Sequence, residues 1–348
     1  MVSTGNPERM WWSKDTIVLV TGANKGIGLQ LVRELARRGL TTILTSRDES
    51  SGRKAIESLL EEGIDRERLV YHQLDITSPD SVDALADWVS RSYGSIEILV
   101  SRDLELEFRC FSSRPADSSL FSSLVFFQIN NAGVNSIGVP DLEQAKYVVE
   151  TNYYGTKRVI EAMVPLLKPG ARIVNVSSKA GDLAYLKNEW NAKLEDIATL
   201  TPSKIDEMIQ EFFRAVEAKE IKARGWPCMG EELPLAPPEM LAGYSLSKIA
   251  LNAYARIIAE KLAREKEIFL NSMCPGSTST AMSGFRGHSV EIGADTAVWI
   301  ALLPPGTPEE PLPHGRFFMD RKDVGFSQMP VFYDGQFYKS LGELPKSK

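Results

Sequence analysis

The chain has 348 residues, 43% of them hydrophobic, so it can bury a full core as one large α/β domain or as two small ones. Its net charge of −6 argues against nucleic acid and anionic membranes as partners. No apolar run approaches the roughly 18 residues of a membrane span, and no break in composition favours two domains.

Residues 1–14 have neither the apolar core of a signal peptide nor the Arg- and Ser-rich pattern of a transit peptide. We expect them to be a flexible tail, with Trp11 and Trp12 at the edge of a sheet, and residues 15–348 to form one domain in the cytoplasm. The three cysteines have no metal-binding spacing and cannot all pair, which is typical of a reducing compartment. The sequence therefore predicts no metal site.

The first element is an apolar, β-branched run, residues 16–20, that ends at a glycine-rich turn, residues 21–28. Beyond the turn, apolar residues recur at helical spacing up to Gly39, and a second apolar run follows at residues 41–45. This pattern predicts a β-α-β unit. Glycines let the backbone approach a pyrophosphate, which the amides and dipole of a helix N-terminus stabilise. The turn predicts a dinucleotide cradle, although a tight turn without a ligand also fits. Its predicted cofactor contacts are Gly22, Asn24, Lys25, Gly26, Ile27 and Gly28.

The second strand ends at Arg47 and Asp48, where such folds distinguish their two cofactors. An arginine here can pair with the 2′-phosphate of NADP, whereas an acidic residue accepts from the ribose 2′-hydroxyl of NAD. Lys25 adds positive charge near the same phosphate. The sequence favours NADP(H), and Asp48 leaves NAD open.

A charged helix is expected over residues 49–62 and a third strand over residues 69–74. The turn that follows leads into a helix with Pro79 at its first position. Residues 96–100 form the fourth predicted strand. The pattern is then interrupted, because residues 101–129 are rich in Ser and Phe and have neither helical nor strand periodicity.

After Asn130-Asn131-Ala132-Gly133, a long helix is expected over residues 141–167. It carries Asn152 in its interior, where asparagine is mildly unfavourable. Either a function or a simple surface position would explain this residue. A strand over residues 171–176 ends at Ser177-Ser178.

Far downstream, Tyr244 and Lys248 are spaced to share one face of a helix. A neighbouring ammonium favours the phenolate, so the pair could transfer a proton at neutral pH. Taken alone, the spacing also fits an ordinary surface pair.

Five motifs follow one another in the order that is typical of one family: the glycine turn, Asn130–Gly133, Asn175–Ser178, Tyr244–Lys248 and Cys274–Gly276. In this order they resemble the short-chain dehydrogenase/reductases. The resemblance covers residues 16–320 and is finest to the carbonyl-reductase-like branch, which includes the plant salutaridine reductase and neomenthol dehydrogenase group. It implies an α/β fold, a doubly wound (Rossmann) parallel sheet of about seven strands with helices on both faces.

The resemblance also implies a catalytic tetrad of Asn152, Ser178, Tyr244 and Lys248. The backbone carbonyl of Asn152 would hold a water that relays protons to Lys248. Ser178 would hydrogen-bond the substrate carbonyl, Tyr244 would donate the proton, and Lys248 would lower the tyrosine pKa and bind the nicotinamide ribose.

Further cofactor contacts are implied by position. Asp75 would meet the adenine ring, although a simple helix-entry turn explains this residue equally well. Relatives also place a basic residue at position 279 and an acidic one at position 281, and Ser279 and Ala281 lack both charges. The contacts implied after the glycine turn and Arg47 are Asp75, Ile76, Asn131, Ala132, Gly133, Tyr244, Lys248, Pro275, Gly276, Thr278 and Thr280.

The stretch 179–243 is longer than in short family members and contains an amphipathic helix that begins at Thr201-Pro202. In the resembling branch such an insertion covers the helices used for dimerisation, which implies a monomer; the alternative is that it only packs locally. Residues 282–290 are expected to form a substrate lid, in which Ser283 and His288 either touch substrate or belong to a surface loop. A helix over 291–303 and a last strand over 315–319 complete the fold.

The predicted function is NADPH-dependent reduction of a ketone or aldehyde to an alcohol, or the reverse oxidation. The implied partner is a small-molecule carbonyl or alcohol. An enone double-bond reductase is the first alternative, and Tyr244 argues against it because the tyrosine is replaced in such members. A poorly active NADP-binding splice form and a structural or interaction protein are the others.

Residues 100–128 are hypothesised to be a translated intron. Val100-Ser101 can be encoded as a splice donor, and residues 124–128 as a pyrimidine tract that ends in CAG. Removal joins Leu99 to Ile129, as the family pattern expects. With the insert present, either residues 96–100 keep the strand position, or residues 124–129 replace them and bury Gln128 in a central strand. Either arrangement should leave this form less stable and poorly active.

Overall fold

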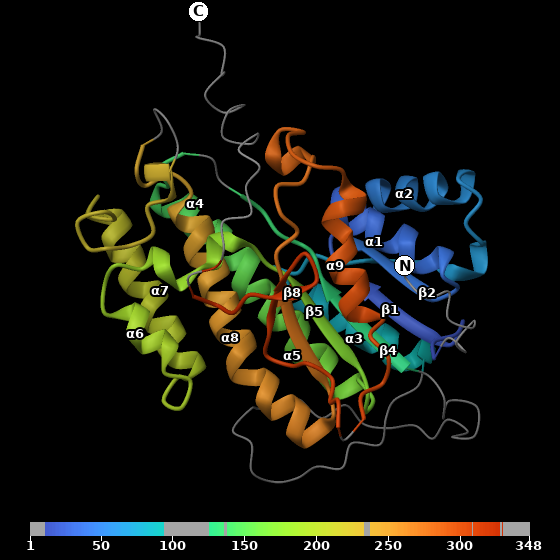
Figure 1. Cartoon of the computed structure of the whole chain (residues 1–348). Coiled ribbons are helices and arrows are strands. Elements are labelled where there is room, and N and C mark those ends of the chain that lie inside the picture. Colours follow the sequence, from blue (N-terminus) through green and yellow to red (C-terminus); the bar gives the residue numbers. More distant parts are fainter. Residues whose placement is uncertain are drawn as a thin grey trace, which may run out of the picture.

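The computed structural model describes residues 11–93, 125–135, 138–232, 237–307, 309–327 and 329. Its centre is one sheet in the order β3-β2-β1-β4-β5-β6-β7-β8 (Figure 1). The strands are β1 (Thr16–Val20), β2 (Thr41–Ser46), β3 (Leu69–Gln73), β4 (Val125–Asn130), β5 (Arg172–Val176), β6 (Phe269–Met273), β7 (Phe317–Met319) and β8 (Lys322–Asp323). All neighbours pair in parallel except β7 and β8. The short antiparallel β8 is one strand more than the sequence predicts.

Helices cover both faces of this sheet, as the doubly wound fold requires (Figure 1). One layer contains α1 (Gly26–Arg37), α2 (Glu49–Glu61) and α9 (Val290–Ala301). The other contains α3 (Pro79–Tyr93), α4 (Leu142–Val149), α5 (Thr156–Met163) and α8 (Ala242–Lys266). Strand β1 shows why two layers are needed. Its side chains alternate between two cores, with Ile17 and Leu19 in one and Val18 and Val20 in the other. The predicted Rossmann architecture is confirmed.

The predicted long helix over residues 141–167 has an irregular centre. Between α4 and α5 the chain forms a π-helical turn, Glu150–Gly155, and beyond α5 a 3-10 turn, Val164–Leu166. A π turn inside a helix changes the direction of the side chains that it carries, and such turns are frequent at functional sites. Asn152 lies in this turn.

The inserted stretch between β5 and α8 contributes α6 (Trp190–Glu195) and α7 (Pro202–Glu217). Thr201 caps α7 by accepting a hydrogen bond from the Lys204 amide at 3.3 Å, and Pro202 occupies the first helical position. The apolar face of α7 packs on α4 and α8. The three helices lie at the left of the molecule in Figure 1.

The position between β1 and β5 is occupied by the end of the atypical segment. The predicted strand over residues 96–100 lies outside the described residues, and β4 pairs Gln128 with Leu19 on one side and with Ile173 on the other. This is the second of the two predicted arrangements. The Gln128 side chain is fully buried; its Nε2 donates to Asn130 Oδ1 at 2.7 Å, and its Oε1 has no partner. A buried carbonyl left without a donor costs about 1–3 kcal/mol.

Trp11, which precedes the predicted domain boundary at residue 15, packs on the domain. The Trp11 ring lies 4.0 Å from the guanidinium of Arg172, and its indole donates to Leu302 O at 3.2 Å. Arg172 is buried without a carboxylate partner among the described residues, and burial lowers its pKa to about 10. The aromatic ring and the backbone carbonyls of Gly170 and Leu303 stabilise this charge instead.

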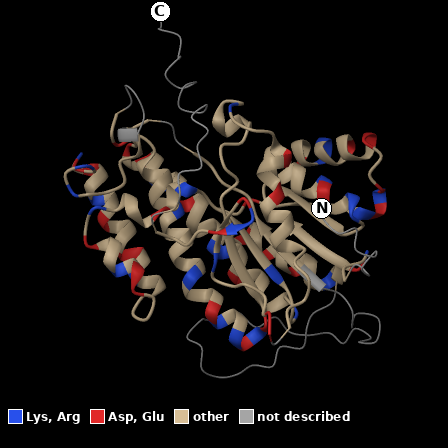
Figure 2. Cartoon of the chain, in the orientation of Figure 1, with Lys and Arg blue, Asp and Glu red and all other residues tan. Residues whose placement is uncertain are grey.

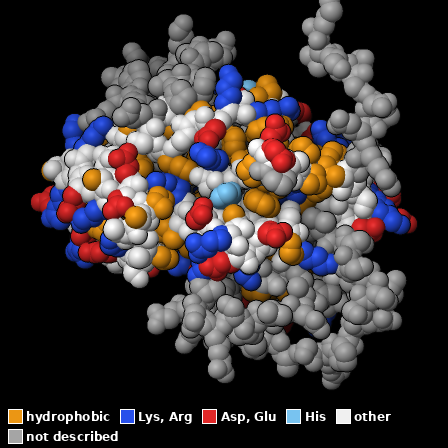
Figure 3. All heavy atoms as spheres, turned by 60° about the horizontal axis from the view of Figure 1, so that its bottom comes forward, with side chains coloured by type: hydrophobic (Ala, Val, Ile, Leu, Met, Phe, Trp, Pro, Cys, Tyr) orange, Lys and Arg blue, Asp and Glu red, His pale blue; other side chains and the backbone are white. Residues whose placement is uncertain are grey.

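Basic and acidic side chains are mixed along the outer helices and over the face seen in Figure 3 (Figures 2 and 3). Within the described part of the chain, no helix is both long enough and apolar enough to cross a membrane.

Candidate active site

Most of the predicted site residues follow the carboxyl ends of parallel strands β1 to β6, and the others lie in the π turn and on α8. In doubly wound folds, ligands bind at this edge, where the order of the strands reverses. The reversal here falls between β1 and β4.

The glycine turn is closed against the segment that follows β4. Gly22 and Gly26 have φ values of +61° and +57°, which L side chains rarely adopt. A Cβ at Gly22 would lie 2.8 Å from Ala132 Cα, and one at Gly28 would lie 2.4 Å from Asn131 Nδ2. The side-chain Nδ2 of Asn131 donates to Thr21 O and Gly22 O at 3.1 and 3.0 Å. The predicted residues Asn131, Ala132 and Gly133 therefore lie beside the turn.

These residues fit a dinucleotide. The turn leads directly into α1, where Lys25 is the N-cap and its side chain makes no capping hydrogen bond. The first amides of α1 therefore keep their capacity to bind a pyrophosphate. Thr280, from the loop after β6, lies against the turn, since a Cβ at Gly26 would lie 3.3 Å from its Cγ2.

Arg47 and Asp48 differ in what they can offer a ribose. The Asp48 carboxylate caps α2, accepting from the Ser51 amide at 2.8 Å and from the hydroxyls of Ser50 and Ser51 at 2.8 and 2.6 Å. These donors hold the Asp48 pKa at about 2. Arg47 is exposed at the end of β2, and a hydrogen bond to the Tyr147 hydroxyl raises its pKa. Of the two residues, Arg47 is the better placed to meet a phosphate.

Asp75 forms a helix-entry turn, the second of the two roles that the sequence suggests for it. Its Oδ1 accepts from the Thr77 amide at 3.0 Å and from the Thr77 hydroxyl at 2.7 Å. Ile76 packs against the π turn, where a Cβ at Gly155 would lie 2.9 Å from Ile76 Cγ1. The adenine contact of Asp75 stays a prediction.

Helix α8 presents Tyr244 and Lys248 one turn apart. Lys248 is buried, its Nζ donates to Val176 O at 3.2 Å, and it lies 5.7 Å from the centroid of the Tyr244 ring. Burial lowers the pKa of Lys248 to about 8. Burial also raises the pKa of Tyr244 to about 12, against the opposing effect of a hydrogen bond with Ser178. Ser178, Tyr244 and Lys248 therefore lie together.

Asn152 joins this group from the π turn and is not a surface residue. Its side chain is completely buried, accepts from the Val134 amide at 2.8 Å, and donates to Val134 O at 2.9 Å and Ser247 Oγ at 3.0 Å. It thereby holds the segment after β4 against α8. A Cβ at Gly133 would lie 3.2 Å from Asn152 Oδ1 and 3.8 Å from Lys248 Nζ.

The loop after β6 is held by its own polar groups. Thr278 donates to Pro275 O at 3.1 Å, and Ser283 donates to Thr278 O at 2.7 Å. His288 approaches Gly276 so closely that a Cβ there would lie 2.6 Å from its Nε2. Ser283 and His288 therefore shape the loop. Phe285 on the same loop is 75% exposed, and no pattern in the sequence singles it out.

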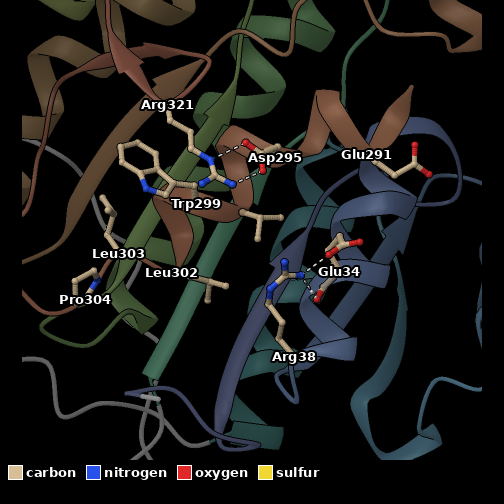
Figure 4. A pocket seen from close by; sticks show the side chains of 10 residues that line it. Glu34, Arg38, Glu291, Asp295, Trp299, Leu302, Leu303, Pro304 and Arg321 are labelled. Atoms are coloured by element: carbon tan, nitrogen blue, oxygen red, sulfur yellow. Dashed lines mark hydrogen bonds and ion pairs between the residues drawn. The ribbon is translucent and has the colours of Figure 1, made fainter. Parts of the chain in front are cut away.

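A cleft of about 370 Å³ between α1 and α9 is separate from this site (Figure 4). Two ion pairs line it, Arg38 with Glu34 and Arg321 with Asp295. None of the predicted site residues does so. Among the described residues, no group of His, Cys, Asp and Glu could hold a metal ion.

Comparisons with known proteins agree with this geometry. The family model for short chain dehydrogenases matches residues 16–102. Short-chain dehydrogenase/reductase 1 of Saponaria officinalis is 38% identical, over 83% of this chain and 91% of that protein. Carbonyl reductase [NADPH] 1 of Rattus norvegicus is 36% identical, over 88% of this chain and 96% of that protein.

Among solved structures, salutaridine reductase from Papaver somniferum superposes with a TM-score of 0.69 at 29% identity. The match covers 88% of this chain and 99% of that one. Relatives of more than 30% identity are thus matched almost end to end. The chain therefore belongs to the short-chain dehydrogenase/reductase family and, within it, to the carbonyl-reductase-like branch.

Proposed function

We propose that the protein reduces a ketone or aldehyde to an alcohol with NADPH, or catalyses the reverse oxidation. The observation that carries the proposal is that Tyr244 and Lys248 lie one turn apart on α8, with Lys248 Nζ 5.7 Å from the centre of the Tyr244 ring and Ser178 beside the phenol. The names of two relatives, carbonyl reductase [NADPH] 1 and salutaridine reductase, support the same reaction class.

Each side chain has a role that its surroundings permit. When bound, NADPH supplies the hydride. Ser178 donates a hydrogen bond to the substrate carbonyl, and Tyr244 donates the proton to its oxygen. Lys248 stabilises the tyrosinate that results, which matters because burial opposes that charge. Asn152 holds the segment after β4 in place and keeps the π turn against α8.

The preference for NADPH rests on Arg47. Its guanidinium is exposed at the end of β2, while the neighbouring Asp48 carboxylate is occupied by the cap of α2. A guanidinium pairs well with a phosphate, whereas an NAD-specific site needs a carboxylate that is ready to accept from the ribose. The double-bond reductase alternative gains no support, because Tyr244 is present and hydrogen-bonded to Ser178.

We also propose that the protein acts as a monomer. Helix α7, in the inserted stretch, packs over α4 and α8 (Figure 1), and the family resemblance implies that such an insertion covers the helices that other members use to dimerise. Its location in the cytoplasm stays a prediction from the sequence.

The test is a titration with NADPH and with NADH, followed by a panel of ketones and aldehydes. We expect NADPH to bind and to be oxidised in the presence of at least one carbonyl compound. Binding without turnover on the whole panel would favour the alternative of a poorly active NADP-binding splice form, and absence of binding would overturn both.

A further inference from the structure

Asn252 lies one helical turn beyond Lys248 on α8, and its side chain is 1% exposed. Both ends of its amide bind the segment that carries Ser178. Its Oδ1 accepts from Ser177 Oγ at 2.7 Å, and its Nδ2 donates to Gly181 O at 3.2 Å. The two bonds therefore hold the chain on either side of Ser178.

A second side chain of α8 completes this attachment. Ser245 Oγ donates to Ala180 O at 2.6 Å. The turn Lys179–Gly181 also touches the helix backbone, because a Cβ at Gly181 would lie 2.4 Å from Asn252 Nδ2 and 2.9 Å from Lys248 O. Any side chain at position 181 would clash with α8, so glycine is needed there for the turn to approach the helix this closely.

The attachment fixes the geometry of the reacting groups. Ser178 caps the turn by accepting from the Ala180 amide at 3.1 Å. The same helix, α8, carries Tyr244 and Lys248. A displacement of Ser178 by about 1 Å would separate its hydroxyl from the phenol, and misplacements of that size can cost about a hundredfold in rate.

We propose that Asn252 is a positioning residue for the reduction, because it holds the segment that carries Ser178 against the helix that carries Tyr244. This inference rests on the function proposed above. Asn252 touches neither reacting group, so it acts only through the segment from Ser177 to Gly181. In sequence, an asparagine four residues after Lys248 is the one signal that points to it.

The test compares Asn252→Ala with Asn271→Ala. Asn271 is a matched control on β6: it is 2% exposed, donates to Pro313 O at 2.7 Å and accepts from the Arg316 amide at 3.1 Å. Both variants should lose stability, since each removes two buried hydrogen bonds. Only Asn252→Ala should lower kcat for carbonyl reduction, by about a hundredfold. Its Kd for NADPH should stay unchanged.

A milder variant keeps the test decisive if Asn252→Ala does not fold. Ser177→Ala removes a single bond to Asn252 and should lower kcat by about fivefold. If the variant that folds has the same kcat as the wild type, the role of Asn252 is overturned and the proposed function still stands. An equal loss of kcat in Asn271→Ala would also overturn that role, because the effect would then follow stability. A wild-type protein that reduces no carbonyl compound would overturn the proposed function and this inference with it.

Discussion

The ammonium of Lys248 lies 5.7 Å from the centre of the Tyr244 ring, and burial shifts the pKa values of the two groups in opposite directions. The pKa of Lys248 falls to about 8, so this residue loses its charge within the range in which the enzyme can be assayed. The pKa of Tyr244 rises to about 12, so the proton donor stays protonated there.

These two shifts predict the pH dependence of reduction. Below pH 8, Lys248 is charged and stabilises the developing tyrosinate; as the pH rises through about 8 this charge is lost. We expect kcat/KM for the carbonyl substrate to fall on the alkaline side of about pH 8. Tyr244 alone would produce no decline below pH 10. A profile that is flat from pH 7 to 10 would contradict the role of Lys248.

Tyr244→Phe should abolish carbonyl reduction and leave NADPH binding intact. The ring keeps its packing on α8, and only the hydroxyl that bonds Ser178 is lost. General acid catalysis contributes about 10²–10⁴-fold to a rate, so the rate of carbonyl reduction should fall by at least that factor relative to the wild type. Single-turnover assays and NADPH fluorescence titration measure the two quantities separately. Turnover at the wild-type rate would refute the assigned mechanism.

Arg47→Asp should shift the preference from NADPH towards NADH. The substitution reverses the charge at the end of β2, next to an Asp48 that is already occupied by its helix cap. The ratio of kcat/KM for the two cofactors is the measurement. Arg53→Asp, on the exposed side of α2, is the matched control. If the wild type and Arg47→Asp have equal ratios of kcat/KM for NADPH and NADH, Arg47 does not determine the cofactor preference.

Deletion of residues 100–128 should raise both the melting temperature and the NADPH-dependent activity. Joining Leu99 to Ile129 keeps the register of β4 and replaces Gln128 by Leu99 and Phe127 by Ile98. The buried amide carbonyl that has no donor disappears, which should stabilise the sheet by about 1–3 kcal/mol. Loss of the Phe127 ring beside Arg172 offsets part of this gain.

Gln128→Leu in the full chain separates the two effects of this deletion. It removes the same buried amide and keeps the insert, so it should raise the melting temperature and change activity little. The intron hypothesis would be falsified if the deletion variant were less stable than the full chain, or if the genomic DNA lacked splice signals at the two borders.

Light scattering coupled to size exclusion should give the mass of one chain. Helix α7 buries Ile205, Met208 and Phe212 against the body of the domain, over α4 and α8. A dimer mass at micromolar concentration would contradict the proposed monomer.

Local patterns in the sequence were sufficient to predict those features of the structure that depend on one short segment. The glycines that need φ above zero, the cap at Thr201 and the shared face of Tyr244 and Lys248 all depend on residues within one or two turns of each other. These features follow from backbone sterics and helical periodicity, so they are legible without the fold.

Contacts between distant segments decided the rest. Whether Asn152 is a surface residue depends on how Val134 and Ser247 meet it. The choice of β4 is of the same kind. Two stretches of the chain have strand character, and only pairing with β1 and β5 assigns the central position to the one that buries Gln128. Burial and hydrogen-bond partners of this kind exist only after the chain has folded, because they join residues that the sequence separates by tens of positions.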